Sequence, residues 1–109
     1  MKNLQYFDNG YIVDPEDEGN KRYKILYMSA EYDNDRENLP GVSRIVYGVD
    51  IECAGHIPSN LKSEAETELF NALADREYFD EDPDCEKKAA RDLSMLTGVP
   101  KDKINVVFG

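Results

Sequence analysis

Apolar and polar positions alternate most regularly in the middle of the chain. Within residues 42–53 an apolar side chain recurs at every second position, at Ile45, Tyr47, Val49, Ile51 and Cys53. This period of two predicts a β-strand that buries these side chains on one face and turns the residues between them, Asp50 and Glu52 included, to solvent.

A second long strand is predicted over residues 22–32, where apolar side chains occupy both sides of an extended chain. Both of its faces are therefore expected to be partly covered. The polar segment 33–41 that joins the two strands is too short for a helical crossover, so they are expected to pair antiparallel.

Shorter strands are expected at both ends of the chain. Asn9-Gly10 lies between apolar flanks, and because both residues tolerate positive φ this dipeptide predicts a β-hairpin. Residues 14–20 combine a proline, a glycine and four carboxylates, which is typical of an exposed loop. Residues 104–108 predict a final strand.

Two helices are expected between these strands. Pro58 and Ser59 introduce the first, whose apolar positions keep helical spacing at Leu61, Ala65, Leu69, Ala72 and Leu73. Ser63 and Glu66 match a capping-box pattern inside it. Asp82-Pro83 predicts the start of the second. Gly98 and Pro100 should end that helix, after an apolar stripe of Cys85, Ala89, Leu93 and Leu96.

This order predicts an α+β fold in a single domain of residues 1–109, with two helices packed on one face of an antiparallel sheet. The sheet would consist of the N-terminal hairpin, the two long strands and the C-terminal strand. Apolar residues make up 40% of the chain, enough for a folded core. No apolar run reaches the length of a membrane helix or resembles a secretory signal, so a cytoplasmic protein is expected.

Charge is the unusual feature of the composition. Asp and Glu number 23 against 13 Lys and Arg, which leaves −10 at neutral pH. The excess is spread evenly, because six bases and eleven acids lie up to His56 and seven bases and twelve acids follow it. Such a surface keeps a protein soluble and repels nucleic acid and anionic membranes. Direct binding to either is not expected.

Residues suited to catalysis are few, and we expect no enzyme. His56, the one histidine, lies in a turn without a nucleophile motif such as G-x-S-x-G. Cys85 opens a helix but is surrounded by carboxylates, so it is interpreted as a buried packing residue. Cys53 and Cys85 lack redox or zinc spacing and are expected to be free thiols. No phosphate-binding loop is present, and no cofactor is expected.

Calcium is the metal that the sequence comes nearest to binding. Asp80, Asp82 and Asp84 match the first three ligands of an EF-hand loop, but Cys85 replaces its glycine and Arg91 its final glutamate. The repeat at residues 33–37 fails in the same way. No metal site is expected, with weak surface binding as the alternative.

The remaining candidate site is the distribution of carboxylates itself. A rigid array of carboxylates can meet the Lys and Arg side chains with which nucleic-acid-binding proteins hold phosphates. The predicted partner-binding residues lie on the first helix and around the start of the second: Glu64, Glu68, Asp75, Glu77, Asp80, Glu81, Asp82, Asp84 and Glu86. A merely solvated surface is the alternative. The tyrosines are interpreted as strand formers, because a base-stacking platform needs a basic groove.

These observations predict a small, acidic, non-catalytic inhibitor of the phage or mobile-element type, either anti-CRISPR or anti-restriction. Its partner would be a basic protein, a nuclease above all. An immunity protein against a nuclease toxin requires the same physics and stays open. A host accessory protein, acidic only for solubility, is a third possibility, and an enzyme or metal-binding protein that uses His56 is a fourth.

Overall fold

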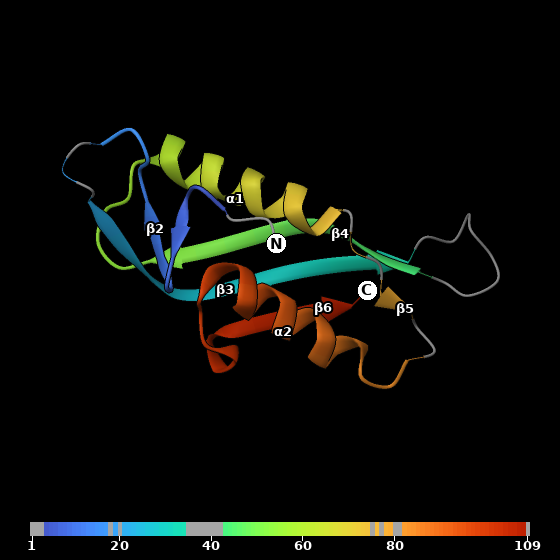
Figure 1. Cartoon of the computed structure of the whole chain (residues 1–109). Helices are drawn as coiled ribbons and strands as arrows, with labels where there is room; N and C mark the ends of the chain where they lie inside the picture. Colours follow the sequence, from blue (N-terminus) through green and yellow to red (C-terminus); the bar gives the residue numbers. More distant parts are fainter. Residues whose placement is uncertain are drawn as a thin grey trace.

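The computed structural model of the chain describes the backbone of residues 4–17, 19, 21–34, 43–74, 76, 78–79 and 82–108, and all of their side chains except those of 33–34 and 43–45. In chain order the elements are β1 (Phe7–Asp8), β2 (Tyr11–Val13), β3 (Arg22–Asn34), β4 (Ser43–Cys53), α1 (Ser59–Ala74), β5 (Tyr78–Phe79), α2 (Cys85–Thr97), the 3-10 turn η1 (Lys101–Lys103) and β6 (Ile104–Phe108). They form an elongated body of about 50 × 25 × 25 Å, with β3 and β4 along its length (Figure 1).

The sheet is built around β3. Its described strands follow the order β1-β2-β3-β4-β5, and all of these neighbours are antiparallel. β6 pairs with β3 in parallel, Met28 opposite Ile104. Because residues 28–32 of β3 pair with both β4 and β6, these two strands lie on opposite edges of β3. The prediction of a purely antiparallel sheet is therefore wrong for the C-terminal strand, because β6 returns beside β3 in the same direction, and the two-residue β5 was not predicted.

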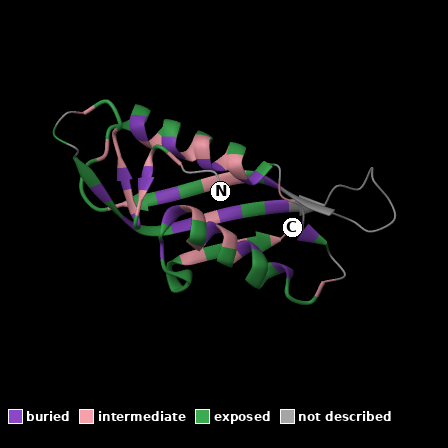
Figure 2. Ribbon diagram, viewed as in Figure 1, coloured by how far each residue is buried: buried purple, intermediate pink, exposed green. Residues whose placement is uncertain are grey.

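Both helices cover one face of this sheet, which confirms the predicted α+β fold. Figure 1 shows α1 running along β4 and α2 beside β6. Their buried side chains join those of the strands in one apolar cluster. Its fully buried members include Met28 and Ile51 from the strands, Leu69 from α1 and Leu93 from α2. Buried and exposed positions accordingly alternate along the central strands (Figure 2).

Local turn signals were predicted correctly. Asn9 and Gly10 have φ of 48° and 87° and join β1 to β2 as a hairpin. Gly98 ends α2 in the left-handed region, at φ 79°. At the other end of α2 the predicted start needs correction, because the helix begins at Cys85 with Asp84 as its N-cap. The Asp82 carboxylate accepts a hydrogen bond from Asp84 N at 2.9 Å in the turn before the helix. These features depend on short-range chemistry alone.

The predicted faces of the two long strands need correction, because β-bulges interrupt both. The register of β3 against β4 shifts between Ile25 and Tyr27 and again between Glu31 and Tyr32. At the second shift Val46 turns to the core, while Tyr47, predicted to be buried, is 57% exposed. A bulge adds one residue and so reverses the inward and outward positions beyond it. Residues 22–32 are also covered on one face only, since Leu26 and Tyr27 are exposed.

The capping box predicted inside α1 is wrong. Ser63 lies in the second turn of a helix that begins at Ser59, so it caps no free N–H group. Glu66 instead reaches sideways to the sheet, where its carboxylate accepts a hydrogen bond from Ile51 N at 2.9 Å. The Glu66 carboxylate therefore satisfies an outward-facing N–H group of β4, which within the described residues pairs with β5 at Ser43 and Arg44.

Candidate functional site

The carboxylates predicted on α1 serve the fold. Glu68 accepts hydrogen bonds from two backbone groups of the N-terminal segment, Gln5 N at 2.8 Å and Tyr6 N at 3.0 Å. Glu64 accepts one from the Tyr6 hydroxyl at 3.0 Å, and this bond is the main cause that raises the pKa of that hydroxyl. Both carboxylates therefore hold the N-terminal segment against α1.

The carboxylates predicted around the start of α2 differ in their availability. Asp82 forms an ion pair with Lys88, and this pair, together with the hydrogen bond from Asp84 N, holds the pKa of the Asp82 carboxyl below its ordinary value. Asp84 and Glu86 are exposed. Asp75, Glu77, Asp80 and Glu81 lie outside the described residues. The structure therefore brings no continuous array together from the described members of this set.

A different acidic surface lies on the open face of the sheet, opposite the helices. The strand registers turn Tyr27, Ser29 and Glu31 of β3 to this face, together with Gly48, Asp50 and Glu52 of β4 and Asn105 and Val107 of β6. We call Glu31, Asp50 and Glu52 the acidic sheet face. All three side chains are exposed. Because the strands hold them, their relative positions are fixed by the fold.

A shallow hollow separates two carboxylates of the acidic sheet face. It measures about 130 Å³ and is lined by Ser29, Glu31, Gly48, Val49 and Asp50. Gly48 stands opposite Glu31 in the register, and a Cβ at Gly48 would lie 3.7 Å from Glu31 Oε2. The missing side chain thus leaves the hollow open between Glu31 and Asp50. Two carboxylates beside such a depression suit the end of a cationic side chain.

Cations are sparse around these carboxylates. Lys62 of α1 reaches the edge of β4, where its Nζ lies 3.9 Å from Asp50 Oδ1, too far for a close hydrogen bond. Arg22 lies at the β2 end of β3 and forms a 2.7 Å ion pair with Asp8. Within the described parts of residues 27–31, 48–52 and 104–107, no Lys or Arg side chain projects from the strands. This part of the sheet is therefore negative.

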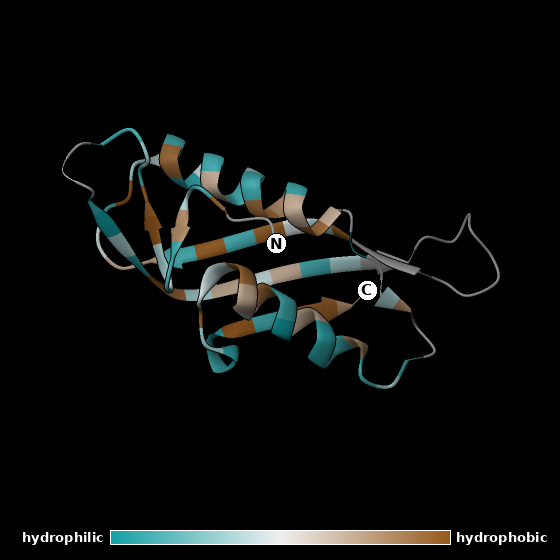
Figure 3. Ribbon diagram, in the orientation of Figure 1, coloured by the Kyte–Doolittle hydropathy of each residue, from teal (hydrophilic) through white to brown (hydrophobic). Residues whose placement is uncertain are grey.

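The sequence contained part of the signal for this surface. The alternation within residues 42–53 correctly predicts that Asp50 and Glu52 face solvent. Glu31 lies in a strand with apolar side chains on both sides, so its pattern does not predict an open face. What was missing is long-range: the register that places Glu31 opposite Gly48, and the absence of a third layer over the open face. Hydropathy follows the same division, with teal and brown segments alternating along β4 (Figure 3).

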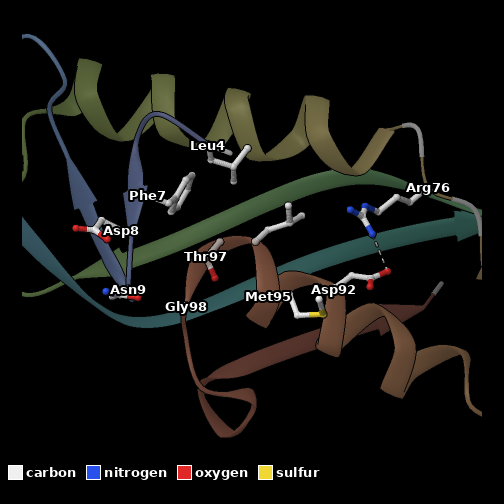
Figure 4. A pocket seen from close by; sticks show the side chains of 10 residues that line it. Leu4, Phe7, Asp8, Asn9, Arg76, Asp92, Met95, Thr97 and Gly98 are labelled. Carbon is white, nitrogen blue, oxygen red and sulfur yellow. Dashed lines mark ion pairs between the residues drawn. The ribbon is translucent and has the colours of Figure 1, made fainter. Parts of the chain in front are cut away.

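A cavity of about 350 Å³ lies on the helix side, between the N-terminal hairpin and α2 (Figure 4). Phe7 and Met95 contribute apolar surface. Arg76 and Asp92 face each other at one end, with an ion pair of 3.3 Å. Thr97 also lines it, but its hydroxyl is committed to Leu93 O at 2.7 Å. The residues lining this cavity include no His, Cys or Ser, so they offer a binding surface without a nucleophile–base pair.

Asp92 also ties the cavity to the core. Its carboxylate accepts a hydrogen bond from the Tyr78 hydroxyl at 2.5 Å. Burial, followed by this bond, strongly raises the pKa of Tyr78. Tyr32 packs edge-on against Tyr78, with ring centroids 5.5 Å apart. These contacts fix β5 and α2 against β3, and they engage the Asp92 carboxylate with both Tyr78 and Arg76.

The remaining candidate side chains stand apart from one another. His56 is exposed between β4 and α1. Cys85 is buried, as its interpretation as a packing residue required, and Cys53 is half-buried. Both are unpaired thiols, and burial raises the pKa of Cys53. Among the residues that the structure describes, no three His, Cys, Asp or Glu side chains are grouped so that they could hold a metal ion.

Comparisons of the chain with protein-family models, with curated proteins and with solved structures find no match. Neither α1 nor α2, the two α-helices of the described chain, is long and apolar enough to cross a membrane.

Proposed function

We propose that this protein is a small non-catalytic inhibitor of the kind that phages and mobile elements direct against RNA-guided nucleases and restriction enzymes. It acts in the cytoplasm, where its acidic surface occupies the basic nucleic-acid-binding groove of its target. The net charge of −10 supports this proposal, because it favours cationic partners and opposes binding to nucleic acid itself.

The observation that carries the proposal is the acidic sheet face. A surface that replaces nucleic acid must present several negative groups at fixed positions, and strands provide that rigidity. Asp50 and Glu52 are two residues apart on β4, which spaces them by roughly 6.6 Å. The hollow beside Glu31 receives a Lys or Arg side chain of the target between two carboxylates. Paired charges of this kind mainly accelerate and orient association.

The test begins with inhibition. Purified protein is titrated into a panel of RNA-guided nucleases, restriction enzymes and nuclease toxins, and displacement of a labelled nucleic acid is measured. We expect displacement from at least one nuclease, with an affinity that falls several-fold as salt rises from about 50 to 200 mM, because exposed ion pairs are screened. Binding that is indifferent to salt, or that leaves the nucleic acid in place, would contradict the proposal.

Charge reversal then locates the binding surface. Glu31→Lys with Glu52→Lys should slow association with the target more than it speeds dissociation. The matched control is Glu16→Lys with Asp102→Lys, which changes the net charge by the same amount on exposed residues of the loop before β3 and of η1. If the control pair slows association as much as the first pair, the association rate depends on net charge alone and the acidic sheet face has no special role.

A further inference from the structure

The two outer edges of the central sheet differ in protection. β4 is shielded, because β5 pairs with its first residues and the Glu66 carboxylate binds Ile51 N. β6 forms the opposite edge, and no strand of the described chain pairs with its outer side. Residues 104–107 of β6 contain no proline and no charged side chain. Proline and charged side chains are what natural edge strands use to avoid pairing with other chains, so β6 lacks this protection.

A groove runs along this unprotected edge. It lies between β6 and α2, measures about 500 Å³ and is lined by Glu86, Lys87, Ala90, Lys101, Ile104, Asn105 and Val106. Ile104 and Val106 provide an apolar floor, and the small Ala90 leaves the helix side open. A free strand edge beside a groove of this kind is how strand addition recognises peptides: main-chain hydrogen bonds give affinity, and the groove selects alternate side chains.

The charge around the groove is opposite to that of the rest of the protein. Residues 85–109 carry five cationic and three acidic side chains, a formal +2, whereas residues 1–84 carry eight and twenty, a formal −12. At the groove itself the exposed Lys87 and Lys101 outnumber Glu86. An occupant with carboxylates is therefore favoured here, unlike at the acidic sheet face.

We propose that the β6–α2 groove binds an extended acidic segment of a partner protein, which adds to the sheet as a strand beside β6. Side chains two positions apart point to the same face of a strand. The segment should therefore carry an apolar residue over Ile104 and Val106, and an Asp or Glu two positions away, next to Lys87 or Lys101. This interaction is separate from the proposed inhibition, and it gives the protein a second docking site.

A second copy of the chain is a weaker occupant. Pairing β6 with β6 of another molecule would place two bodies of net charge −10 side by side and bring two lysine-bearing grooves together. Sedimentation of the purified protein at high micromolar concentration should accordingly show a monomer. A dimer whose β6 amides are protected from exchange would assign the edge to self-association and overturn the proposal.

The main test uses a displayed library of random peptides selected on the full-length protein. We expect enrichment of sequences in which an apolar residue and an Asp or Glu are two positions apart, without proline between them. A synthetic peptide of the enriched sequence should slow hydrogen exchange at backbone amides within residues 104–107. Selected peptides without this pattern, or without protection of β6, would overturn the proposal.

Variants separate groove binding from general attraction. Lys87→Glu with Lys101→Glu should lower the affinity for the selected peptide by about tenfold. Lys103 is exposed on η1 outside the groove, so Lys103→Glu should change this affinity little. Ala90→Leu should narrow the groove and also lower the affinity for the peptide. Its control is Ala74→Leu, which adds the same bulk at the exposed end of α1 and should leave this affinity unchanged. Equal effects of the groove variants and their controls would contradict a site between β6 and α2.

Discussion

Gly98 and Asn9 are in direct backbone contact, although 88 residues separate them in the sequence. A Cβ at Gly98 would lie 2.6 Å from the Cα of Asn9 and 2.7 Å from Gly10 N. Next to this contact, Gly10 N donates a hydrogen bond to Thr97 O at 2.8 Å. The left-handed residues of the hairpin turn and of the helix end thus pack on each other, and they join the N-terminal hairpin to α2.

Gly98→Ala should destabilise the protein strongly. The substitution forces a side chain into the left-handed region, which costs about 1–2 kcal/mol, and it also pushes a methyl group into the backbone of Asn9, which adds about 1–3 kcal/mol. The matched control is Gly55→Ala: Gly55 has φ 75°, but no atom lies within 4 Å of its Cβ position among the described residues. Denaturant unfolding should therefore show a clearly larger loss for Gly98→Ala. Equal losses would mean that the contact with Asn9 contributes nothing.

These turns could be predicted because their chemistry is local. Asn-Gly between apolar flanks and a glycine after the last helical turn act through their own φ angles, so the sequence alone identifies them. The face of a strand is different, because it depends on register. Strict alternation predicts that Tyr47 is buried, and the bulge opposite Glu31 and Tyr32 turns it outward. A bulge is set by both paired strands, and one strand's pattern does not contain it.

The candidate site shows the same limit. Glu64 and Glu68 lie on the polar side of a helical pattern, and nothing in that pattern indicates that an N-terminal segment more than sixty residues away needs acceptors for its N–H groups. The acidic sheet face required knowledge of which face the helices leave uncovered. Composition therefore predicts that the surface charge is negative, while only the tertiary arrangement shows which carboxylates are not engaged in hydrogen bonds within the protein.

Glu68→Gln should loosen the N-terminal segment. The two carboxylate oxygens of Glu68 each accept one backbone N–H, from Gln5 and from Tyr6, whereas a glutamine has one carbonyl oxygen. One N–H loses its acceptor, at a cost of about 1 kcal/mol. Faster hydrogen exchange at Gln5 and Tyr6 should accompany the loss. Glu64→Gln is the control, because a single carbonyl can still accept the Tyr6 hydroxyl. An unchanged exchange rate in Glu68→Gln would show that Glu68 does not hold this segment.

Glu66 should give the protein a measurable pH dependence. Burial raises the pKa of its carboxyl above the ordinary 4.5, although the hydrogen bond from Ile51 N and the nearby Lys62 oppose this shift. A raised pKa means that the folded state favours the protonated form. The contribution of Glu66 to stability is therefore complete below about pH 4.5 and declines as the pH rises through the raised value.

Glu66→Gln tests this expectation, because its carbonyl oxygen can still accept the hydrogen bond from Ile51 N without carrying a charge. The stability of Glu66→Gln relative to the natural protein should increase between about pH 4 and pH 7 and then level off. Glu66→Ala leaves the N–H of Ile51 without its acceptor, so it should be less stable than Glu66→Gln by about 1 kcal/mol at every pH, because neither variant titrates at this position. Urea unfolding across this range measures both. If the difference in stability between Glu66→Gln and the natural protein does not change with pH, the pKa of Glu66 is not raised in the folded state.

The Tyr32 hydroxyl is buried, and no described group meets it with the distance and angle of a hydrogen bond, although the neighbouring Tyr78 hydroxyl acts to lower its pKa. Its side chain is fully buried between Tyr78 and Phe108. A buried polar group without a partner costs about 1–3 kcal/mol, so Tyr32→Phe should stabilise the protein by about 1 kcal/mol. Tyr78→Phe makes the matched control, because it removes the hydrogen bond to Asp92 and should destabilise by a similar amount.

Alkaline titration provides an independent readout of the same site. Burial, aided by the negative charge of Asp92, raises the pKa of Tyr32 to about 12. The folded state thus favours the neutral phenol, and the associated stability declines as the pH rises above about 10, the ordinary tyrosine value. Tyr32→Phe removes this titration, so its advantage over the natural protein should grow between about pH 10 and pH 12. If Tyr32→Phe is destabilising and its difference stays constant above pH 10, the hydroxyl has a partner that satisfies it, and the unpaired geometry around Tyr32 is wrong.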